Sequence, residues 1–295
     1  MITPSRWFIG QAQDRSFVNL REFVKLNNHF RKIFNYLNNG ILFNNVEIKG
    51  GINYFLFDKD YVGQVEFSTL YDNKYDVEMR DLFEVGEDIV LKNSIDYNIS
   101  KKVRNNKFIP LTNITTGRDA FHISSKIEIL EKITSDKQIK GYVIVRCKNN
   151  VIRWIEQSKI KRNIEIFNKY KVFISKSAGD PEKDKKVIGK PYFADKKTVC
   201  TESFFPVGAF DNKIEALNLC KYMHTKFLRY MVSILKTSHN VTQIVYKFVP
   251  LQDFTDKSDI DWSKDIEDID KQLYKKYDLS KDEIDYIESK IKPME

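Results

Sequence analysis

The sequence predicts a mixed fold, running from α/β in its first part to α+β after it and closing on a helical tail. Helix-like and strand-like runs follow one another over residues 1–75, which suits part of an α/β sheet. Short strand-like runs separated by loops and a few helices fill 76–250, and two short amphipathic helices with surplus acidic residues fill 251–295. We therefore expect three parts with these boundaries.

The first part opens with an apolar and aromatic run, Ile2–Phe8, typical of a strand end or the loop beyond it. From Phe17 to Tyr36 the apolar residues recur every three or four positions, which predicts one long helix. Asn38-Asn39-Gly40 would end that helix, since glycine accepts a positive φ. Three strand-like runs follow, at 41–48, 51–57 and 61–70, with a turn at Gly50-Gly51.

In the second part the clearest strands are 141–146 and 170–175, with a helix expected between them over 154–168. Residues 177–190 are polar and contain glycine and proline, which predicts a surface loop. An apolar stripe over 211–235 predicts a long helix. In the tail, Ser280 and Glu283 have the spacing of a capping box at the start of the last helix.

Charge is distributed unevenly along the chain. Residues 252–295 hold 14 acidic and 8 basic residues, a net of −6, whereas the preceding residues hold 41 basic and 27 acidic ones, a net of +14. A basic body is the electrostatic footprint of a protein that neutralises phosphates, although a lysine-rich composition alone gives the same signal.

Other sequence features exclude several classes of protein. No apolar run approaches the ~20 residues that span a bilayer, and the N-terminal residues do not resemble a signal peptide, so we expect a cytoplasmic protein without membrane contact. The three cysteines (Cys147, Cys200, Cys220) and four histidines are scattered, which predicts buried or neutral thiols and no metal site. The acidic residues of the tail alternate with an apolar helical stripe and indicate a solvated face rather than a magnesium-binding nuclease site.

Several strings resemble the C-terminal half of adenine-specific DNA methyltransferases of type II and IIG restriction–modification systems. Ile2–Phe8 resembles the strand-end motif that follows the family's catalytic loop, and Phe43–Lys59 looks like its later aromatic strand motif. Further strings resemble the family's recognition region and tail: 200–203, 222–227, 248–254 and 259–262. The resemblance implies that 1–75 is the end of a methyltransferase α/β domain, 76–250 a DNA target-recognition domain, and 251–295 an acidic helical tail.

Such enzymes transfer a methyl group from S-adenosylmethionine to the N6 atom of an adenine that is flipped out of double-stranded DNA. The resemblance implies that an aromatic side chain of the later strand motif stacks on the flipped base. Phe57 is the first candidate, followed by Phe55 and Tyr54. Phe55 and Phe57 share one face of a strand and Tyr54 lies on the other. The alternative is that all three only pack the sheet.

The motifs that perform the chemistry in this family are missing from the sequence. Its catalytic loop contains two adjacent prolines, and none of the 7 prolines here are adjacent. The glycine-rich loop that binds the methyl donor is also absent, since Gly50-Gly51 lacks the G-x-G spacing and a following helix. We therefore expect no catalytic residue and no cofactor in this chain, with S-adenosylmethionine bound elsewhere in the parent enzyme. The chain would begin part-way through the parent fold.

The expected work of the chain is recognition of double-stranded DNA, with cations on phosphates and polar side chains on base edges. The candidates lie in polar loops and are Lys101, Lys102, Arg104, Lys107, Thr115, Thr116, Arg118, Lys176, Lys185 and Lys186. For each lysine the alternative is a solvated surface charge.

Two other hypotheses remain open. The chain could be an interaction module that pairs with a separate catalytic methyltransferase polypeptide, because a partial sheet leaves an edge and an apolar face uncovered. It could instead be a complete methyltransferase with an unfamiliar donor site, which methyl transfer from labelled S-adenosylmethionine by this chain alone would establish.

Overall fold

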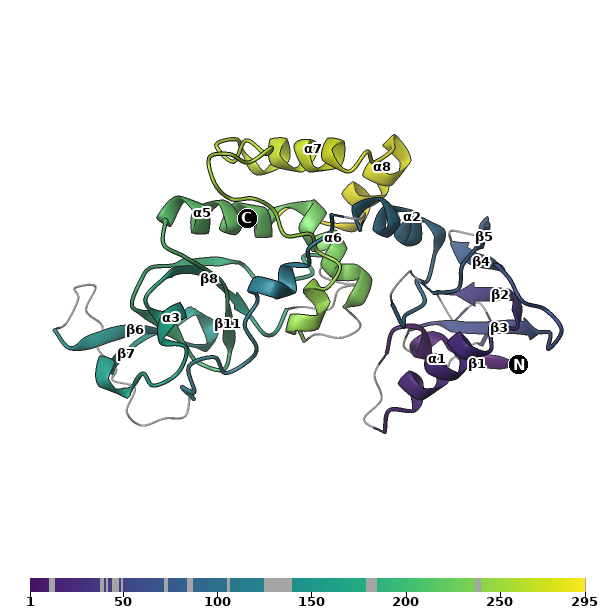
Figure 1. Cartoon of the computed structure of the whole chain (residues 1–295), viewed down its shortest axis with the longest axis horizontal. Coiled ribbons are helices and arrows are strands. Elements are labelled where there is room, and N and C mark those ends of the chain that lie inside the picture. The colour runs from purple at the N-terminus through teal and green to yellow at the C-terminus, as the bar shows by residue number, and fades with distance from the viewer. Residues whose placement is uncertain are drawn as a thin grey trace. The chain divides into compact units, whose positions relative to one another are not determined.

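The computed structural model confirms a mixed α/β fold in two compact units, Met1–Val103 and Arg104–Glu295, whose described residues form helices and three separate sheets (Figure 1). It describes residues 1–10, 14–37, 40, 42–43, 48, 50–71, 74–83, 87–104, 107–124, 140–178, 185–236 and 240–294. This division differs from the predicted one. The expected boundary at 75/76 falls inside a strand, β5 (Lys74–Arg80), that pairs along its whole length with β4 (Val65–Tyr71).

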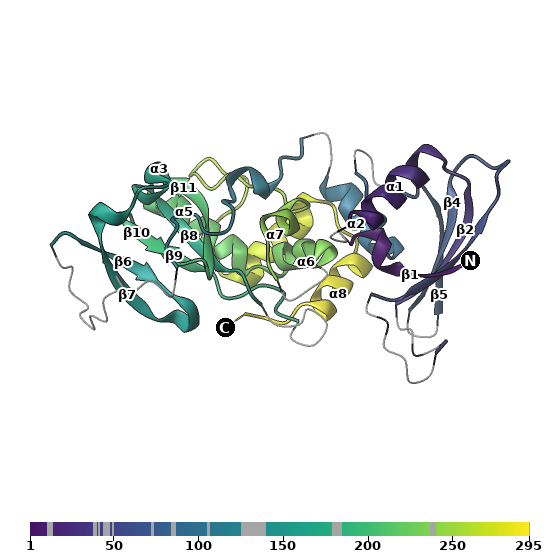
Figure 2. The same ribbon diagram turned by 90° about the horizontal axis from the view of Figure 1, so that it is seen from below.

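Unit 1 is built around a five-stranded sheet in the order β1-β3-β2-β4-β5. Its remaining elements are β1 (Ile2–Pro4), the short 3-10 helix η1 (Ser5–Phe8), α1 (Ser16–Leu26), β2 (Phe30–Tyr36), β3 (Ile52–Phe57) and α2 (Ser94–Val103). Figure 2 shows α1 and α2 on the same side of this sheet. The core on that side includes Trp7, Phe8, Val24, Ile33 and Phe67, all at most 2% exposed.

The predicted helix over 17–36 is wrong in its second half. α1 ends at Leu26, where Asn27 donates from both its backbone and its side chain to the Phe23 carbonyl. The chain then forms β2, which lies between β3 (antiparallel) and β4 (parallel). Apolar residues occur on both faces of such a central strand, and their spacing therefore mimics a helical stripe.

Two predicted strands of unit 1 are confirmed, one of them in part. β3 confirms the strand over 51–57, and β4 confirms the later part of the strand over 61–70. Most of the strand expected over 41–48 lies outside the described residues.

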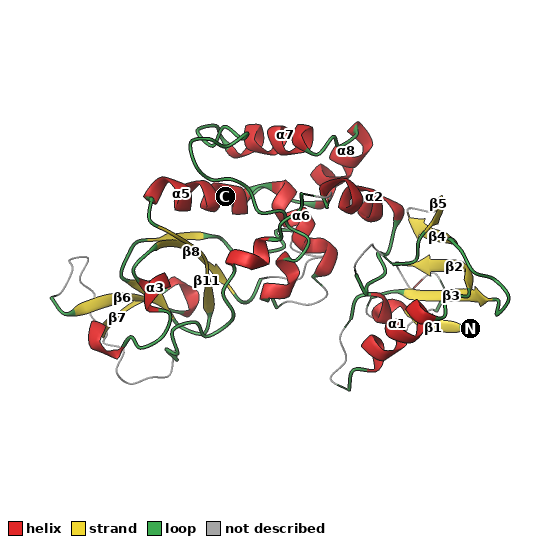
Figure 3. Cartoon of the chain, viewed as in Figure 1, coloured by secondary structure: helices red, strands yellow, loops and turns green. Residues whose placement is uncertain are grey.

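Unit 2 contains two three-stranded sheets, ordered β10-β6-β7 and β11-β8-β9, and a layer of helices (Figure 3). The strands are β6 (Tyr142–Arg146), β7 (Ile152–Glu156), β8 (Tyr170–Ser175), β9 (Tyr192–Ala194), β10 (Thr198–Cys200) and β11 (Phe204–Phe210). The α-helices are α3 (Ile164–Phe167), α5 (Lys213–His224), α6 (Lys226–Leu235), α7 (Ile266–Lys276) and α8 (Lys281–Lys290). Short 3-10 helices are η3 (Leu111–Ile114), η4 (Lys148–Asn150), η5 (Gln157–Lys159) and η6 (Gln243–Tyr246).

β6 and β8 confirm two predicted strands, and α5 with α6 confirms the helical stretch over 211–235, although Thr225 divides it. Thr225 is extended and its hydroxyl accepts the Leu228 N–H at 3.1 Å, so it caps α6. The predicted helix over 154–168 is wrong. Trp154 and Ile155 belong to β7, which pairs with β6, and only the single turn of α3 is helical apart from η5.

The acidic tail is part of unit 2 and not a separate domain. The Asp270 carboxylate on α7 accepts the backbone N–H groups of Lys226 and Phe227 at the start of α6, at 2.9 and 2.8 Å. The predicted capping box of α8 is confirmed, because Ser280 and Glu283 each bond to the other's backbone N–H. In the described part of the chain, no helix is long and apolar enough to span a bilayer.

Candidate nucleic-acid interface

The division into units shows where the positive charge of the chain belongs. Unit 1 has 13 basic and 14 acidic residues, a net of −1. Residues 104–251 of unit 2 have 28 basic and 13 acidic residues, a net of +15, and the tail from 252 has a net of −6. Electrostatic attraction for a polyanion therefore comes from the sheet-containing part of unit 2 and not from unit 1 or the tail.

Within unit 2 the charge is concentrated on and around the β6–β7 hairpin. Residues 140–171 contain nine basic and two acidic residues, a net of +7. Five of these cations are exposed to solvent: Lys140, Lys148, Lys159, Lys161 and Arg162. Figures 1 and 2 both show the hairpin on a side of unit 2 away from α7 and α8. The basic hairpin and the acidic helices thus occupy different faces of one unit.

The hairpin is rigid because one of its faces is buried. Val143 pairs with Ile155 across the two strands, and both side chains are at most 3% exposed and belong to the unit 2 core. The connecting turn runs through Lys148 and Asn149, and Asn149 has a positive φ of 57°. This turn and the opposite, open end of the hairpin are exposed, whereas the strands between them are anchored.

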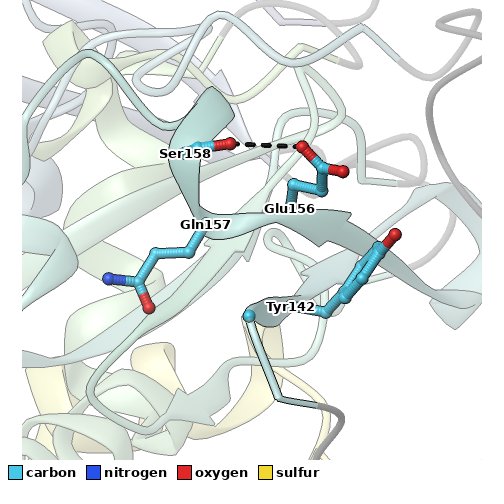
Figure 4. A pocket seen from close by; sticks show the side chains of 5 residues that line it. Tyr142, Glu156, Gln157 and Ser158 are labelled. Atoms are coloured by element: carbon cyan, nitrogen blue, oxygen red, sulfur yellow. Dashed lines mark hydrogen bonds between the residues drawn. The ribbon is translucent and has the colours of Figure 1, made fainter.

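At the open end of the hairpin, five residues line an open hollow of about 530 Å³ (Figure 4). They are Gly141, Tyr142, Glu156, Gln157 and Ser158. The Ser158 hydroxyl donates to the Glu156 carboxylate at 3.2 Å, and the Gln157 backbone N–H donates to the Gly141 carbonyl at 2.9 Å. The hollow is open to solvent, and two of the exposed cations, Lys140 and Lys159, adjoin its lining residues in sequence.

Some basic residues of unit 2 serve the fold instead. Lys171 is fully buried, and its Nζ donates to the carbonyls of Phe167, Lys169 and Asp195 at 3.4, 2.9 and 3.0 Å. Burial lowers the pKa of Lys171 to about 7. Arg229 is 1% exposed and donates to the Lys292 carbonyl at 2.7 Å, and burial lowers its pKa to about 10. Neither side chain can reach a phosphate.

The predicted DNA-contacting residues fall in both units. Lys101 and Lys102 end α2 in unit 1, and the rest lie in unit 2. The guanidinium of Arg104 lies 4.2 Å from the centre of the Phe248 ring, which indicates a packing role. Thr115 is 5% exposed, its hydroxyl donates to the Leu111 carbonyl at 2.8 Å, and its backbone bridges to Val207 on β11, so it is unsuited to direct contact with DNA.

The remaining candidates are more accessible. Lys107, Arg118 and Lys186 are exposed, whereas Thr116, Lys176 and Lys185 are half-buried. The Thr116 backbone N–H donates to the Pro206 carbonyl in β11, and the Lys176 backbone N–H donates to the Ser203 carbonyl just before β11. The Lys185 ammonium donates to the Ser289 carbonyl at the end of α8, 3.2 Å away. The partners of Thr116, Lys176 and Lys185 lie at β11 and α8 and not on the hairpin, and contact of these residues with DNA stays a prediction.

The three aromatic candidates on β3 differ in accessibility. Phe57 is 43% exposed and packs edge-on against His29 and Phe30, with ring centroids 5.4 and 5.7 Å apart. Phe55 is half-buried and lies 4.6 Å from the Phe30 ring, while Tyr54 stacks on Phe34 at 4.7 Å. The structure confirms that Tyr54 occupies the opposite face from Phe55 and Phe57. Stacking of any of them on a base remains a prediction.

The thiols behave as the sequence predicts. All three cysteines are free, Cys147 and Cys200 are buried, and Cys220 is half-buried. Burial raises the pKa of Cys147 and Cys200 and raises that of Cys220 to about 11, which keeps the thiols neutral. Among the residues that the structure describes, no group of three or more histidine, cysteine or acidic side chains could hold a metal ion.

Comparison with known proteins relates part of the chain to a methylase. No family model matches the sequence. Over 130 residues, covering 41% of this chain, it is 29% identical to an uncharacterized adenine-specific methylase of Mycoplasma pneumoniae. The matched region spans only 30% of that protein.

Two solved structures are also similar in part. The type IIG restriction endonuclease BpuSI gives a TM-score of 0.42 at 12% identity, over 98% of this chain and 45% of that enzyme. The type IIL restriction–modification enzyme MmeI, solved in complex with DNA, gives a TM-score of 0.49 at 9% identity, over 97% of this chain and 48% of that enzyme. The chain thus spans about half the length of each.

Sequence reasoning missed the cations and polar residues of the hairpin. It assigned 154–168 to a helix, which placed Gln157, Lys159 and Arg162 on a presumed helical surface. The signal that was available is Lys148-Asn149-Asn150, a turn-forming string between two runs of branched and aromatic residues.

Proposed function

We propose that this chain is the DNA target-recognition part of a site-specific adenine-N6 DNA methyltransferase of a restriction–modification system. The observation that carries the proposal is the net charge of +15 between residues 104 and 251, beside a net of −1 in unit 1. The similarity to an adenine-specific methylase supports the choice of reaction. The sequence strings that resemble the family support the same choice.

In this proposal the exposed cations of the hairpin neutralise phosphates and fix the position of the duplex, while nearby polar side chains read base edges. Unit 1 supplies Phe57, the most exposed of the three β3 aromatic candidates, to stack on the flipped adenine. The chain has neither the Pro-Pro catalytic loop nor the glycine-rich donor loop. S-adenosylmethionine and the catalytic group therefore belong to another part of the parent enzyme.

The test is a titration of the purified chain against a labelled DNA duplex at several salt concentrations. Neutralising six or more phosphates would weaken binding by about 10³-fold or more between 50 and 200 mM salt. A log–log slope steeper than about −5 supports the proposal. Absence of binding at the lowest salt refutes it.

A second candidate function is an interaction module that binds a separate catalytic polypeptide. The observation that favours it is the face of the five-stranded sheet opposite α1. The edge strand β5 exposes Tyr75, Val77 and Met79 on that face, at 54, 57 and 53%, and Leu56 of β3 is 50% exposed. The apolar residues of β5 form an exposed sheet edge, which is typical of an interface, although the Lys32–Glu66 ion pair separates them from Leu56.

Replacing Val77 and Met79 with lysine separates the two functions. If this face is the interface, the double variant should no longer capture the catalytic polypeptide, whereas DNA binding by the chain alone should stay unchanged. The second candidate function would be excluded if the chain stays monomeric beside every co-expressed methyltransferase polypeptide and binds DNA without a partner.

A further inference from the structure

The basic surface of unit 2 explains attraction to DNA, but contacts to phosphates do not discriminate between sequences. Reading the edge of an adenine or a cytosine takes an exposed amide or carboxylate side chain on a backbone that is held in place. In the basic stretch 140–171, the run Glu156-Gln157-Ser158 at the open end of the β6–β7 hairpin meets both conditions (Figure 4). We infer that this run reads base edges in the major groove and that Gln157 is a specificity-determining residue. The inference rests on the proposed function.

The run is exposed but its backbone is fixed. It lies between two buried anchors, Ile155 at 2% and Ile160 at 5% exposure, both in the unit 2 core. Glu156 pairs with Tyr142 across the hairpin, the Gln157 N–H donates to the Gly141 carbonyl, and the Ile160 N–H donates to the Gln157 carbonyl at 3.1 Å. A site held on strands and a tight turn positions its side chains better than a long loop does.

The side chains have the chemistry that base reading needs. Among the described residues, none forms a hydrogen bond with the Gln157 side-chain amide. An amide can donate to N7 and accept from the N6 amino group of one adenine at the same time. Glu156 is oriented by the Ser158 hydroxyl, 3.2 Å away, and can accept from the N4 amino group of cytosine. The Glu156 carboxylate would repel phosphates, so it is suited to contact a base while the neighbouring cations contact the DNA backbone.

The backbone beside the run is open at Gly141. Gly141 has a φ of 84°, and among the described residues no atom lies within 4 Å of the place where a Cβ would be. Lys159 directly follows the run, and Lys140 directly precedes Gly141, whose carbonyl accepts the Gln157 N–H; both lysines are exposed and can contact phosphates. β7 is the edge strand of the β10-β6-β7 sheet, so no further strand of the described residues covers the end of β7 that carries the run.

The experiment selects preferred duplexes from a randomised pool with the full chain, and repeats the selection with Gln157→Ala and Glu156→Gln. Two matched controls change exposed residues of the same unit outside the hollow, Asn168→Ala and Glu165→Gln. We expect Gln157→Ala to lose discrimination at one adenine position by about 5- to 150-fold, with the salt dependence unchanged. We expect Glu156→Gln to alter the preference at a neighbouring position, and both controls to keep the wild-type preference.

The outcomes separate this inference from the proposed function. If the wild-type chain binds no duplex, the proposed function fails and the inference fails with it. If the wild type binds selectively and Gln157→Ala keeps every preference, the inference alone is overturned. Binding by the wild type without any sequence preference also overturns the inference and leaves phosphate clamping intact. Unchanged thermal unfolding of the exposed-site variants excludes a folding defect as the cause.

Discussion

Replacing Lys159, Lys161 and Arg162 together with alanine removes three exposed cations that follow the open end of the β6–β7 hairpin. Each phosphate contact contributes about 0.9 to the log–log slope of affinity against salt. At 0.15 M salt this corresponds to about 5-fold in affinity per contact, and hence to about 150-fold, or ~3 kcal/mol, for three contacts. The slope itself should fall by about 2.7.

The assay is fluorescence anisotropy with a labelled duplex between 50 and 300 mM salt. The matched control removes three exposed lysines from the acidic tail, Lys264, Lys271 and Lys275, and so changes the net charge equally. We expect the control to change affinity by less than about 5-fold, because these lysines lie among acidic residues on α7 or just before it. Equal weakening by the two triple variants, or no effect of the hairpin variant, would refute a hairpin-centred interface.

Three further predictions concern the scaffold. In a urea titration, Phe55→Ala should lower the free energy of unfolding by about 3 kcal/mol, because Phe55 packs against the core of unit 1. Phe57→Ala should lower it by only about 1 kcal/mol, because Phe57 is 43% exposed. Similar losses for the two variants would contradict this difference in burial. Burial lowers the pKa of Lys171 from 10.5 to about 7, so between these pH values the unfolded chain binds more protons than the folded chain. The free energy of unfolding should therefore rise with pH across that window, by up to ~1.4 kcal/mol per pH unit. Lys171→Met should flatten this rise, and an unchanged profile would show that burial does not destabilise the ammonium. Asp270→Ala should lower the free energy of unfolding by about 3 kcal/mol, measured by denaturation, because the buried Phe227 N–H and the partly buried Lys226 N–H at the start of α6 lose their acceptor. A loss below 1 kcal/mol would show that water replaces the carboxylate.

Local patterns were sufficient for elements whose partners are near in sequence. The tail helices follow from their apolar stripes and from the Ser280–Glu283 capping box, which needs only four residues. β6 and β8 follow from branched and aromatic runs. In each case the signal and the structure that it specifies lie within one short window.

Patterns failed where a distant partner decides the structure. β2 reads as a helix because both of its faces are apolar, and only β3 and β4 on either side make it a strand. The edge strand β7 was also mistaken for a helix, because it is a strand only through its pairing with β6, and that error hid the run from Glu156 to Arg162. The overall basic charge was readable from the sequence, but its concentration in unit 2 required the division between Val103 and Arg104.

We propose that the basic part of unit 2, and its hairpin above all, binds double-stranded DNA. Amide hydrogen exchange of the full chain with and without a DNA duplex can locate the binding surface, because it reports where protection appears. We predict slower exchange over residues 140–162 on binding, with no change over α7 and α8. Protection confined to unit 1 or to the acidic tail, with the hairpin unaffected, would show that the hairpin is not the DNA-binding surface.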